Sequence, residues 1–216
     1  MTNSKPLVPH RDRSQEIGKR AVDLTLGLIL GIASAPLLLA VYLAIRLISK
    51  GPVLYRHARI GKDGQSFELW KFRSMVINAE EVLSKHLATN PEAKAEWELT
   101  QKLRDDPRVL PIGRWLRKTS LDELPQFWNV IRGEMSLVGP RPITRDEMCR
   151  YADASEAYKA VRPGMTGLWQ VSGRSNTSYV ERVALDEHYV ATRSIWLDLH
   201  ILIRTAPALL LREGAC

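Results

Sequence analysis

A run of 22 residues from Leu24 to Ile45 contains no charged side chain and no His, Asn or Gln. As a continuous helix this run would be roughly 33 Å long, against a bilayer hydrocarbon thickness of about 30 Å. The run is longer than the apolar part of a cleavable signal peptide, and basic residues follow it instead of a cleavage site. The sequence therefore predicts a segment that contacts the bilayer.

Basic residues flank this run on both sides, and the tendency of Lys and Arg to stay in the cytoplasm favours the cytoplasmic face at both ends. They are Lys5, Arg11, Arg13, Lys19 and Arg20 before the run and Arg46, Lys50, Arg56, Arg59 and Lys62 after it. Pro36 lacks an N–H group and breaks or kinks a helix, and Ser34 is the nearest hydroxyl to the carbonyls that it frees. These features favour a re-entrant helix-break-helix. A kinked ordinary span, with uninformative basic ends, is the alternative.

Composition narrows the class of protein further. With 216 residues, 45% of them hydrophobic and 25% charged, the chain is neither disordered nor a polytopic membrane protein. Its 31 basic against 24 acidic residues give a net charge of +7, which indicates an anionic partner: nucleic acid, anionic lipid or a phosphorylated small molecule. Cys149 and Cys216 form neither a metal-ligand spacing nor a disulfide framework, so we expect the catalytic part to be intracellular.

The remainder of the chain predicts a mainly helical α+β fold. Two short strands, at 53–57 and 67–72, surround a glycine turn, and Asn90-Pro91 divides the stretch from 77 to 104 into two helices. A further helix covers Ile112 to Lys118, and the interrupted apolar stretch 195–211 is either a core helix or an interfacial one. We expect three parts: a basic N-terminal segment (1–23), a re-entrant membrane helix (24–45) and a compact cytoplasmic catalytic domain with a small β-hairpin and interfacial helices (46–216).

Two adjacent carboxylates, Asp122 and Glu123, lie where a helix is expected to begin. Ser120 and Glu123 fit a capping box, but Asp122 is itself a good cap and would place Pro125 in the tolerated first turn, so a start near Asp122 is favoured. The free N–H groups of a helix start suit phosphate, and acids beside them suit magnesium. The alternative is that both acids only cap the helix.

Cations that could bind phosphate occur in three further motifs. Lys71 lies near the end of the second strand and Arg73 directly after it, Arg117 precedes Asp122 by five residues, and two prolines hold the backbone around Arg141. A rigid guanidinium can bind a phosphate with two hydrogen bonds, and a lysine supplies a point charge. The run 161–174, with Arg162 and Arg174 near its ends, is typical of a glycine-punctuated anion or nucleotide loop, or of a simple turn between strands.

Other chemistries lack their sequence signatures in this chain. It has no Walker-type glycine loop and no dinucleotide fingerprint, and its five histidines show no zinc spacing. No plausible serine or cysteine triad is present. A carboxylate nucleophile or a metal-assisted mechanism therefore remains.

Four ordered motifs resemble those of the bacterial sugar transferases, the monotopic polyprenol-phosphate phosphoglycosyl transferases. They are Lys71–Met75, Arg117–Gln126, Gly133–Pro142 and Arg162–Gly167, and the resemblance spans almost the whole chain after about residue 18. Length and the region Val183–Asp186 look closest to the short exopolysaccharide members, the undecaprenyl-phosphate galactose phosphotransferases. Longer relatives carry an additional N-terminal multi-span region, so a minimal catalytic form is expected here.

The resemblance implies a re-entrant membrane helix and a catalytic Asp-Glu dyad at Asp122 and Glu123. In that family the Asp is the nucleophile that takes a sugar phosphate from a UDP-sugar with Mg²⁺ as cofactor, and Glu123 would assist the second step or hold the metal. By motif position, Lys71, Arg117 and Arg141 would be the phosphate-site cations. One departure is Ala35, which separates Ser34 from Pro36, where many members have Ser directly before Pro.

The expected reaction transfers a sugar 1-phosphate to undecaprenyl phosphate, releases UMP and initiates exopolysaccharide synthesis at the cytoplasmic face of the bacterial inner membrane. The expected partners are the UDP-sugar, undecaprenyl phosphate and membrane lipids, with no nucleic acid. Sugar identity, polyprenol length, a homo-oligomeric state and any contribution of Asp186 or Asp198 stay open. The alternative function is a non-catalytic, basic, membrane-anchored scaffold that binds lipid or nucleic acid.

Overall fold

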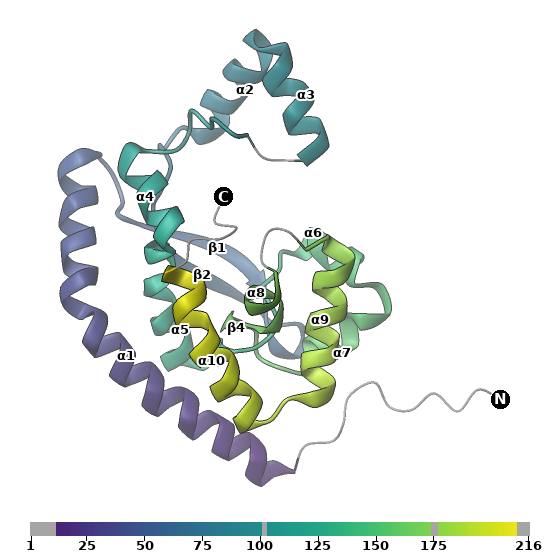
Figure 1. The fold of residues 1–216 in the computed structure, drawn as a ribbon. Coiled ribbons are helices and arrows are strands. Elements are labelled where there is room, and N and C mark those ends of the chain that lie inside the picture. The colour runs from purple at the N-terminus through teal and green to yellow at the C-terminus, as the bar shows by residue number, and fades with distance from the viewer. Residues whose placement is uncertain (1–11, 101–102, 174–176, 211–216) are drawn as a thin grey trace.

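The computed structural model describes residues 12–100, 103–173 and 177–210 (Figure 1). Arg174, one of the predicted anion-binding residues, and the basic residues Lys5 and Arg11 lie outside this part. In chain order the elements are α1 (Arg13–Ile48), β1 (Leu54–Ile60), η1 (Lys62–Gly64), β2 (Ser66–Phe72), α2 (Ala79–Thr89), α3 (Pro91–Thr100), α4 (Pro111–Thr119), η2 (Leu121–Gln126), α5 (Phe127–Arg132), β3 (Ser136–Val138), α6 (Arg145–Met148), η3 (Cys149–Ala154), α7 (Ser155–Lys159), β4 (Gly164–Thr166), α8 (Leu168–Ser172), α9 (Tyr179–Thr192) and α10 (Ile195–Leu210). The predicted mainly helical α+β architecture is confirmed.

The apolar run lies within one continuous helix, α1, of 36 residues, with Pro36 inside it. Figure 1 shows that α1 changes direction between a longer N-terminal part and a shorter C-terminal part. Proline removes one backbone hydrogen bond and its ring crowds the carbonyl of Ile32, which bends a helix without unwinding it when the neighbouring bonds persist. Ser34 Oγ donates to the carbonyl oxygen of Gly31 at 3.0 Å, which satisfies one acceptor near the bend. The break expected at Pro36, beside Ser34, is therefore wrong in one respect: the helix bends there and does not break.

One face of α1 packs against the rest of the molecule and the other is exposed. Gly27 allows a close approach to α5, because a Cβ added there would lie 3.3 Å from Val130 Cγ1. Val41 and Ile45 are buried near the other end, in a cluster with Phe72 and Leu116. The exposed large apolar side chains of α1 include Leu28, Ile29, Leu30, Ile32, Leu37, Leu39, Leu43, Leu47 and Ile48. Within the described residues, α1 is the one helix long and apolar enough to cross a membrane, which is consistent with membrane association.

A buried polar cluster, here called the anchor, joins the N-terminal part of α1 to the body. It consists of Lys19, Asp23, Ser136 and Asp198. Lys19 Nζ lies 3.0 Å from a carboxylate oxygen of Asp23 and 3.0 Å from one of Asp198, which is on α10. Asp23 also accepts a hydrogen bond from Ser136 Oγ at 3.0 Å. Both carboxylates are almost completely buried, so the ammonium group between them supplies the charge balance that such burial requires.

The predicted hairpin and helices between α1 and the dyad are confirmed. β1 and β2 form an antiparallel pair in which Tyr55 lies opposite Lys71 and Arg59 opposite Phe67. The two helices expected between 77 and 104 are α2 and α3, and the helix expected over 112–118 is α4. The hairpin, α5, β3, α9 and α10 together enclose the main core, to which β3 and β4 contribute a short parallel pair.

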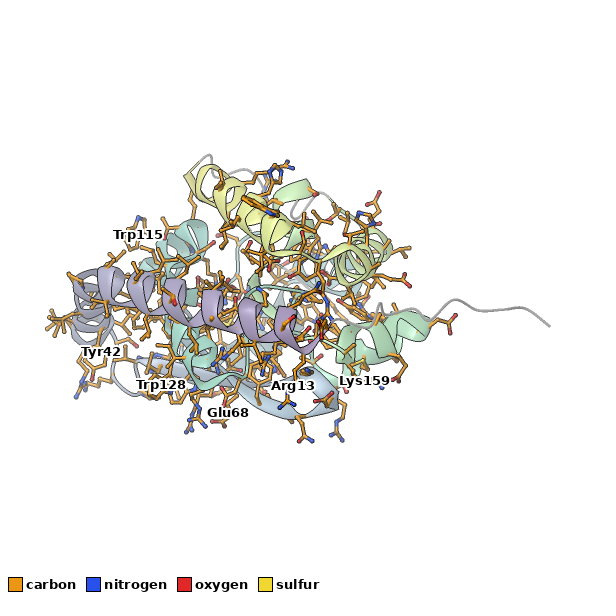
Figure 2. All side chains as sticks on the ribbon, turned by 90° about the horizontal axis from the view of Figure 1, so that it is seen from below. Arg13, Tyr42, Glu68, Trp115, Trp128 and Lys159 are labelled. Atoms are coloured by element: carbon orange, nitrogen blue, oxygen red, sulfur yellow. The ribbon has the colours of Figure 1, made fainter. Side chains whose placement is uncertain are left out.

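The stretch from Ile195 combines the two roles that the sequence left open. On α10, Ile201 is fully buried in the main core, whereas Trp196 and Ile203 are exposed. Two more half-exposed tryptophans, Trp115 on α4 and Trp128 on α5, lie on either side of α1 in Figure 2. Tryptophan is common at membrane–water interfaces, so these positions are compatible with interfacial helices.

Candidate active site

A cleft of about 990 Å³ lies between the β1–β2 hairpin, the α4–η2 turn and the segments that follow β3 and β4. Its lining includes six residues that the sequence had singled out: Lys71, Arg73, Arg117, Asp122, Glu123 and Arg141. These residues come from four separate stretches of the chain, and the fold brings them to one concavity. A cleft that gathers several cations around two carboxylates is suited to a phosphorylated ligand.

The carboxylate dyad lies just beyond an unusual backbone turn. α4 ends at Thr119, and the next residue, Ser120, has left-handed dihedral angles (φ 55°, ψ 18°). Asp122 and Glu123 occupy the first turn of the 3₁₀ helix η2. Ser120 makes no side-chain cap, so the capping box considered from the sequence is not formed. The Glu123 carboxylate instead lies 2.5 Å from Lys71 Nζ. Helix capping therefore does not account for either acid.

Asp122 is the more buried member of the dyad, with 8% of its surface exposed. Burial, and then the neighbouring Glu123 carboxylate, raise the pKa of Asp122 to about 6, against the opposing influence of Lys71 and Arg117. Arg117 is itself held in place, because its Nε donates to Ser74 Oγ at 2.9 Å. A carboxylate whose pKa is shifted by burial in a cleft is a candidate for chemistry rather than for surface solvation.

Arg141 reaches the cleft from the loop after β3. The loops that follow the carboxyl ends of parallel strands meet at one edge, and Trp169 and Gln170, which follow β4, line the same cleft. The Arg141 side chain donates from Nη1 to Glu147 Oε1 at 2.9 Å. Its backbone N–H donates to Asp186 Oδ2 at 3.3 Å, so the loop is held by more than the two flanking prolines.

The two aspartates whose roles were left open have different surroundings. Asp186 is buried beside the Arg141 loop, and it accepts a hydrogen bond from Tyr151 Oη at 2.8 Å. Burial raises the pKa of Asp186 to about 7, although the Tyr151 hydrogen bond opposes this. Asp186 therefore supports the backbone of a cleft residue. Asp198 does not line the cleft, because it belongs to the anchor of α1.

The other three predicted cations are Arg73, Arg162 and Arg174. Arg73 lines the cleft but is buried, and its Nη2 donates to the carbonyl oxygen of Ser49, just after α1, at 3.3 Å. Arg162 does not line this cleft, since its Nε donates to the Gly133 carbonyl oxygen at 2.7 Å on another side of the molecule. Arg174 lies outside the described residues. Of the described residues of the predicted glycine-punctuated run, 161–173, Trp169 and Gln170 line the cleft.

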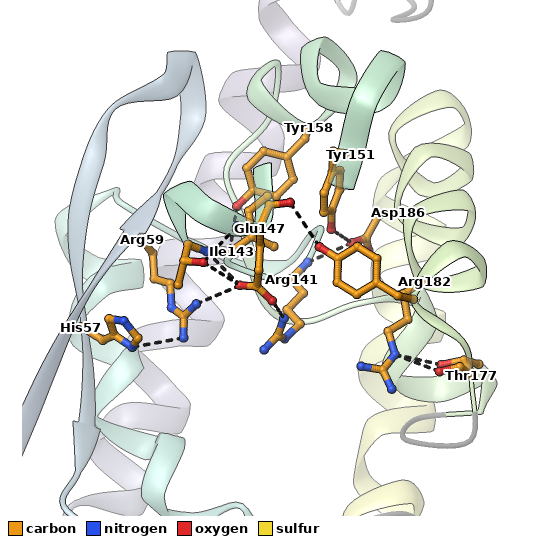
Figure 3. A network of polar contacts seen from close by, with 12 residues as sticks. His57, Arg59, Arg141, Ile143, Glu147, Tyr151, Tyr158, Thr177, Arg182 and Asp186 are labelled. Atoms are coloured by element: carbon orange, nitrogen blue, oxygen red, sulfur yellow. Dashed lines mark hydrogen bonds and ion pairs between the residues drawn. The ribbon is translucent and has the colours of Figure 1, made fainter. Parts of the chain in front are cut away.

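Sequence reasoning missed two residues of this region, Arg59 and Glu147. Arg59, His57 and Tyr55 line the cleft because alternate residues of a strand share one face, and Tyr55 lies opposite Lys71. This alternation could have identified Arg59 from the sequence, because it places Arg59 on the same strand face as Tyr55 and His57. Glu147 is the fourth residue of a Thr144-x-x-Glu147 capping box at the start of α6, a pattern that was also readable in the sequence. Figure 3 shows Glu147 between Arg59 and Arg141.

The donor set of the cleft limits which metal it could hold. No group of three or more His, Cys, Asp or Glu side chains suited to a metal occurs among the residues described. Mg²⁺ commonly binds through one or two carboxylates and takes its other ligands from water and substrate phosphates. Asp122 and Glu123 therefore fit a magnesium ion that arrives with a phosphorylated substrate, and they do not fit a cage made of protein ligands alone.

The long apolar helix is consistent with membrane association, and the cation-lined cleft is suited to phosphorylated ligands, which together indicate the class of protein. A family model described as "Bacterial sugar transferase" matches residues 14–212, and the chain belongs to this family. The predicted family is thus confirmed.

Several curated relatives support this membership. The chain is 50% identical over 91% of its length to the UDP-galactose-lipid carrier transferase of Erwinia amylovora, and 48% identical over 94% to the undecaprenyl-phosphate galactose phosphotransferase of Salmonella typhimurium. It spans only 42% of each of these two proteins. It is also 49% identical over 92% of its length to the exopolysaccharide production protein ExoY of Sinorhizobium fredii, of which it covers 88%.

Proposed function

We propose that this protein transfers a sugar 1-phosphate from a UDP-sugar to undecaprenyl phosphate, with release of UMP, and thereby initiates exopolysaccharide synthesis. The observation that carries the proposal is the buried Asp122 in a cleft lined by Lys71, Arg117 and Arg141. The names of the relatives from Salmonella typhimurium and Sinorhizobium fredii support the lipid acceptor and the exopolysaccharide product.

The proposed reaction has two transfer steps. An Asp122 carboxylate oxygen bonds to the sugar-linked phosphorus, the bond from that phosphorus to the bridging oxygen breaks, and the bridging oxygen leaves with its electron pair as part of UMP. An oxygen of undecaprenyl phosphate then attacks the same phosphorus, and the bond to Asp122 breaks. The carboxylate is regenerated, and the product is undecaprenyl-diphosphate-sugar.

The cations of the cleft would reduce the charge repulsion that opposes this reaction. A carboxylate that approaches a diphosphate is repelled, and Lys71, Arg117 and Arg141 would neutralise and orient the phosphoryl groups. Glu123, which pairs with Lys71, keeps that ammonium group beside the nucleophile. When Mg²⁺ is bound with the substrate, Asp122 and Glu123 would be its protein ligands, and it would supply further positive charge for the diphosphate.

A panel of UDP-sugars offered with undecaprenyl phosphate tests the reaction. We propose galactose as the sugar because two of the relatives carry it in their names. UMP release and a lipid-linked product with UDP-galactose would support the full proposal, and a product with only glucose or an N-acetyl sugar would change the sugar. A membrane-anchored scaffold without catalysis would release no UMP from any donor.

The pH dependence of the first step provides a prediction. Asp122 must be ionised to attack, and its pKa in the folded protein is raised to about 6, so the nucleophile is mostly protonated below that pH. We expect kcat/KM for the UDP-sugar to rise about tenfold per pH unit below pH 6 and to level off above it. A pH–rate profile from pH 4.5 to 8 checks this. A flat profile between pH 5 and 7 would contradict the assignment.

We also propose that α1 enters and leaves by the cytoplasmic leaflet of the bacterial inner membrane. The support is that both ends of the apolar run pack on one body: Lys19 and Asp23 through the anchor, and Val41 and Ile45 through the cluster with Phe72. A helix that crossed the bilayer would carry one of these ends away from a body on the cytoplasmic side. The bend near Pro36 and the flanking basic residues support the same topology.

Cysteine labelling of intact cells provides the topological prediction. In a chain whose native Cys149 and Cys216 are replaced, single cysteines at positions 2 and 49 should both be protected from an impermeant reagent. Pro36→Ala should straighten the helix and expose position 2 in part of the population, since roughly 33 Å of apolar helix suffices to span. Labelling of position 2 but not of position 49 in the unaltered helix would identify an ordinary span.

A further inference from the structure

A pair of guanidinium groups held by one carboxylate lies toward the end of β1 that is farther from the C-terminal end of α1. Glu147 accepts from Arg141 Nη1 through one carboxylate oxygen, at 2.9 Å, and from Arg59 Nη1 through the other, at 3.2 Å. The second oxygen also accepts from the Thr144 backbone N–H at 2.9 Å, as part of the capping box of α6. Glu147 is therefore fixed by its own helix and in turn fixes two arginines that come from distant parts of the chain.

This arrangement leaves positive charge facing the cleft. Arg59, Arg141 and Glu147 together carry a net charge of +1, and both arginines line the cleft. Arg59 is largely buried, and its Nε has no hydrogen-bond partner. Burial, and then the nearby Arg141 charge, lower the pKa of Arg59, whereas, against the opposing effect of burial, Glu147 raises the pKa of Arg141. A bound anion would favour the charged form of Arg59.

The positions along the strands separate this pair from the dyad. Lys71, which pairs with Glu123, lies opposite Tyr55, whereas Arg59 lies four residues farther along β1, roughly 13 Å away at the usual strand rise. Arg141 is within electrostatic range of both groups, since the Glu123 charge acts on Arg141 and the Arg141 charge acts on Arg59. In Figure 3 the guanidinium ends of Arg59 and Arg141 point to the same side, away from Tyr151 and Tyr158.

The direction of β1 decides which phosphate this end of the cleft suits. β1 begins at Leu54, a few residues after α1 ends at Ile48, so the Lys71 end of the hairpin lies near the C-terminal end of α1. Under the proposed topology, a lipid phosphate approaches from that side. Arg59 lies near the opposite end of β1, which is left for the water-soluble nucleotide.

We propose that Arg59 and Arg141, held together by Glu147, form a subsite for a phosphate monoester, and that this subsite binds the phosphate of the leaving UMP. The proposal rests on the proposed function. In the first transfer step the bridging oxygen departs with its electron pair and leaves new negative charge on the UMP phosphate. Two fixed guanidinium groups are suited to stabilise that charge. Arg59 contacts the ligand in this proposal, and Glu147 is a positioning residue.

UMP binding to the purified full-length protein tests the subsite without any turnover. Arg59→Gln should weaken UMP binding roughly 10- to 100-fold, the usual effect of losing a charge-assisted hydrogen bond. The matched control is Arg56→Gln, because Arg56 lies on the same strand, faces the other way, and makes an exposed ion pair with Glu68. Uridine, which lacks the phosphate, should bind both variants and the native protein equally. Equal UMP affinity in Arg59→Gln and Arg56→Gln overturns the proposal.

Two further variants separate a binding defect from a folding defect. Arg59→Lys keeps the charge and should recover part of the UMP affinity, whereas a misfolded chain would not be rescued. Glu147→Gln should weaken UMP binding and slow exchange of labelled UMP into UDP-sugar, while attack of undecaprenyl phosphate on the preformed intermediate stays within about twofold. Loss of only that second step would assign the arginines to the acceptor phosphate and overturn the proposal. If the native protein binds UMP through Arg59 yet transfers no sugar phosphate, the proposed function fails and the subsite stands.

Discussion

Asp122→Asn is expected to lower sugar-phosphate transfer by about 10³-fold or more and to abolish any covalent phosphosugar adduct. The amide keeps the shape of the side chain but cannot act as the nucleophile, and the loss of a nucleophile is among the largest effects of a single substitution. Folding should not suffer. The pKa of Asp122 is raised to about 6 in the folded state, so above that pH its ionised form destabilises the fold, and Asn removes this cost. UMP release, intact-protein mass spectrometry and thermal unfolding measure the three quantities.

The control for this substitution is Asp153→Asn, at an exposed acid outside the cleft lining. It should retain native activity and stability. A covalent intermediate also predicts ping-pong kinetics for the UDP-sugar and undecaprenyl phosphate. Near-normal turnover in Asp122→Asn would remove this residue from the mechanism, and a strictly sequential kinetic pattern would argue against the adduct.

Lys19→Met is expected to have the largest effect on stability, a loss of about 3–5 kcal/mol, because it leaves two buried carboxylates without their cation. The ammonium group lies 3.0 Å from Asp23 and 3.0 Å from Asp198, and both acids are 2% exposed. Chemical unfolding of the purified protein in detergent measures the loss. Lowering the pH should recover part of it, since protonation neutralises the unpaired acids; burial already raises the pKa of Asp198.

The matched control is Lys85→Met on α2, where Lys85 pairs with Glu81 on an exposed helix face. Exposed pairs one helical turn apart contribute little, so no measurable change is expected there. Adding Asp198→Asn to Lys19→Met should restore part of the stability, because it removes one unpaired charge. If Lys19→Met and Lys85→Met unfold alike, the anchor does not hold α1 to the body.

Much of the fold and part of the candidate site are predictable from local sequence. Glycine and proline positions delimit the hairpin and the helices around Asn90-Pro91, and the apolar run identifies α1. The cations Lys71, Arg117 and Arg141 each lie in a dense local motif, and all three line the cleft. These features depend on neighbours within a few residues, which a sequence displays directly.

The features that escaped prediction depend on contacts between distant residues. Glu147 fits a local capping pattern, but its ion pair with Arg59 joins positions 88 residues apart. Glu123 fits a capping box equally well, yet the approach of Lys71 on β2 gives its carboxylate a different partner. The same holds for α1: a proline indicates a weak point, but packing along both halves of the helix determines whether that point unwinds or bends.

The short connection between α1 and β1 fixes the distance between the end of the helix and the start of the hairpin. Arg73 holds both of its ends, because its side chain donates to the Ser49 carbonyl oxygen and its backbone N–H donates to the Val53 carbonyl oxygen at 2.8 Å. Six residue steps from Ile48 to Leu54 reach at most roughly 20 Å, and this clamp prevents the connection from stretching. The hairpin face with Lys71 therefore lies at a fixed distance from the C-terminal end of α1. Under the proposed function, an acceptor is therefore selected by the distance of its phosphate from the membrane surface. The length of its hydrocarbon chain, which lies inside the membrane, does not affect this selection.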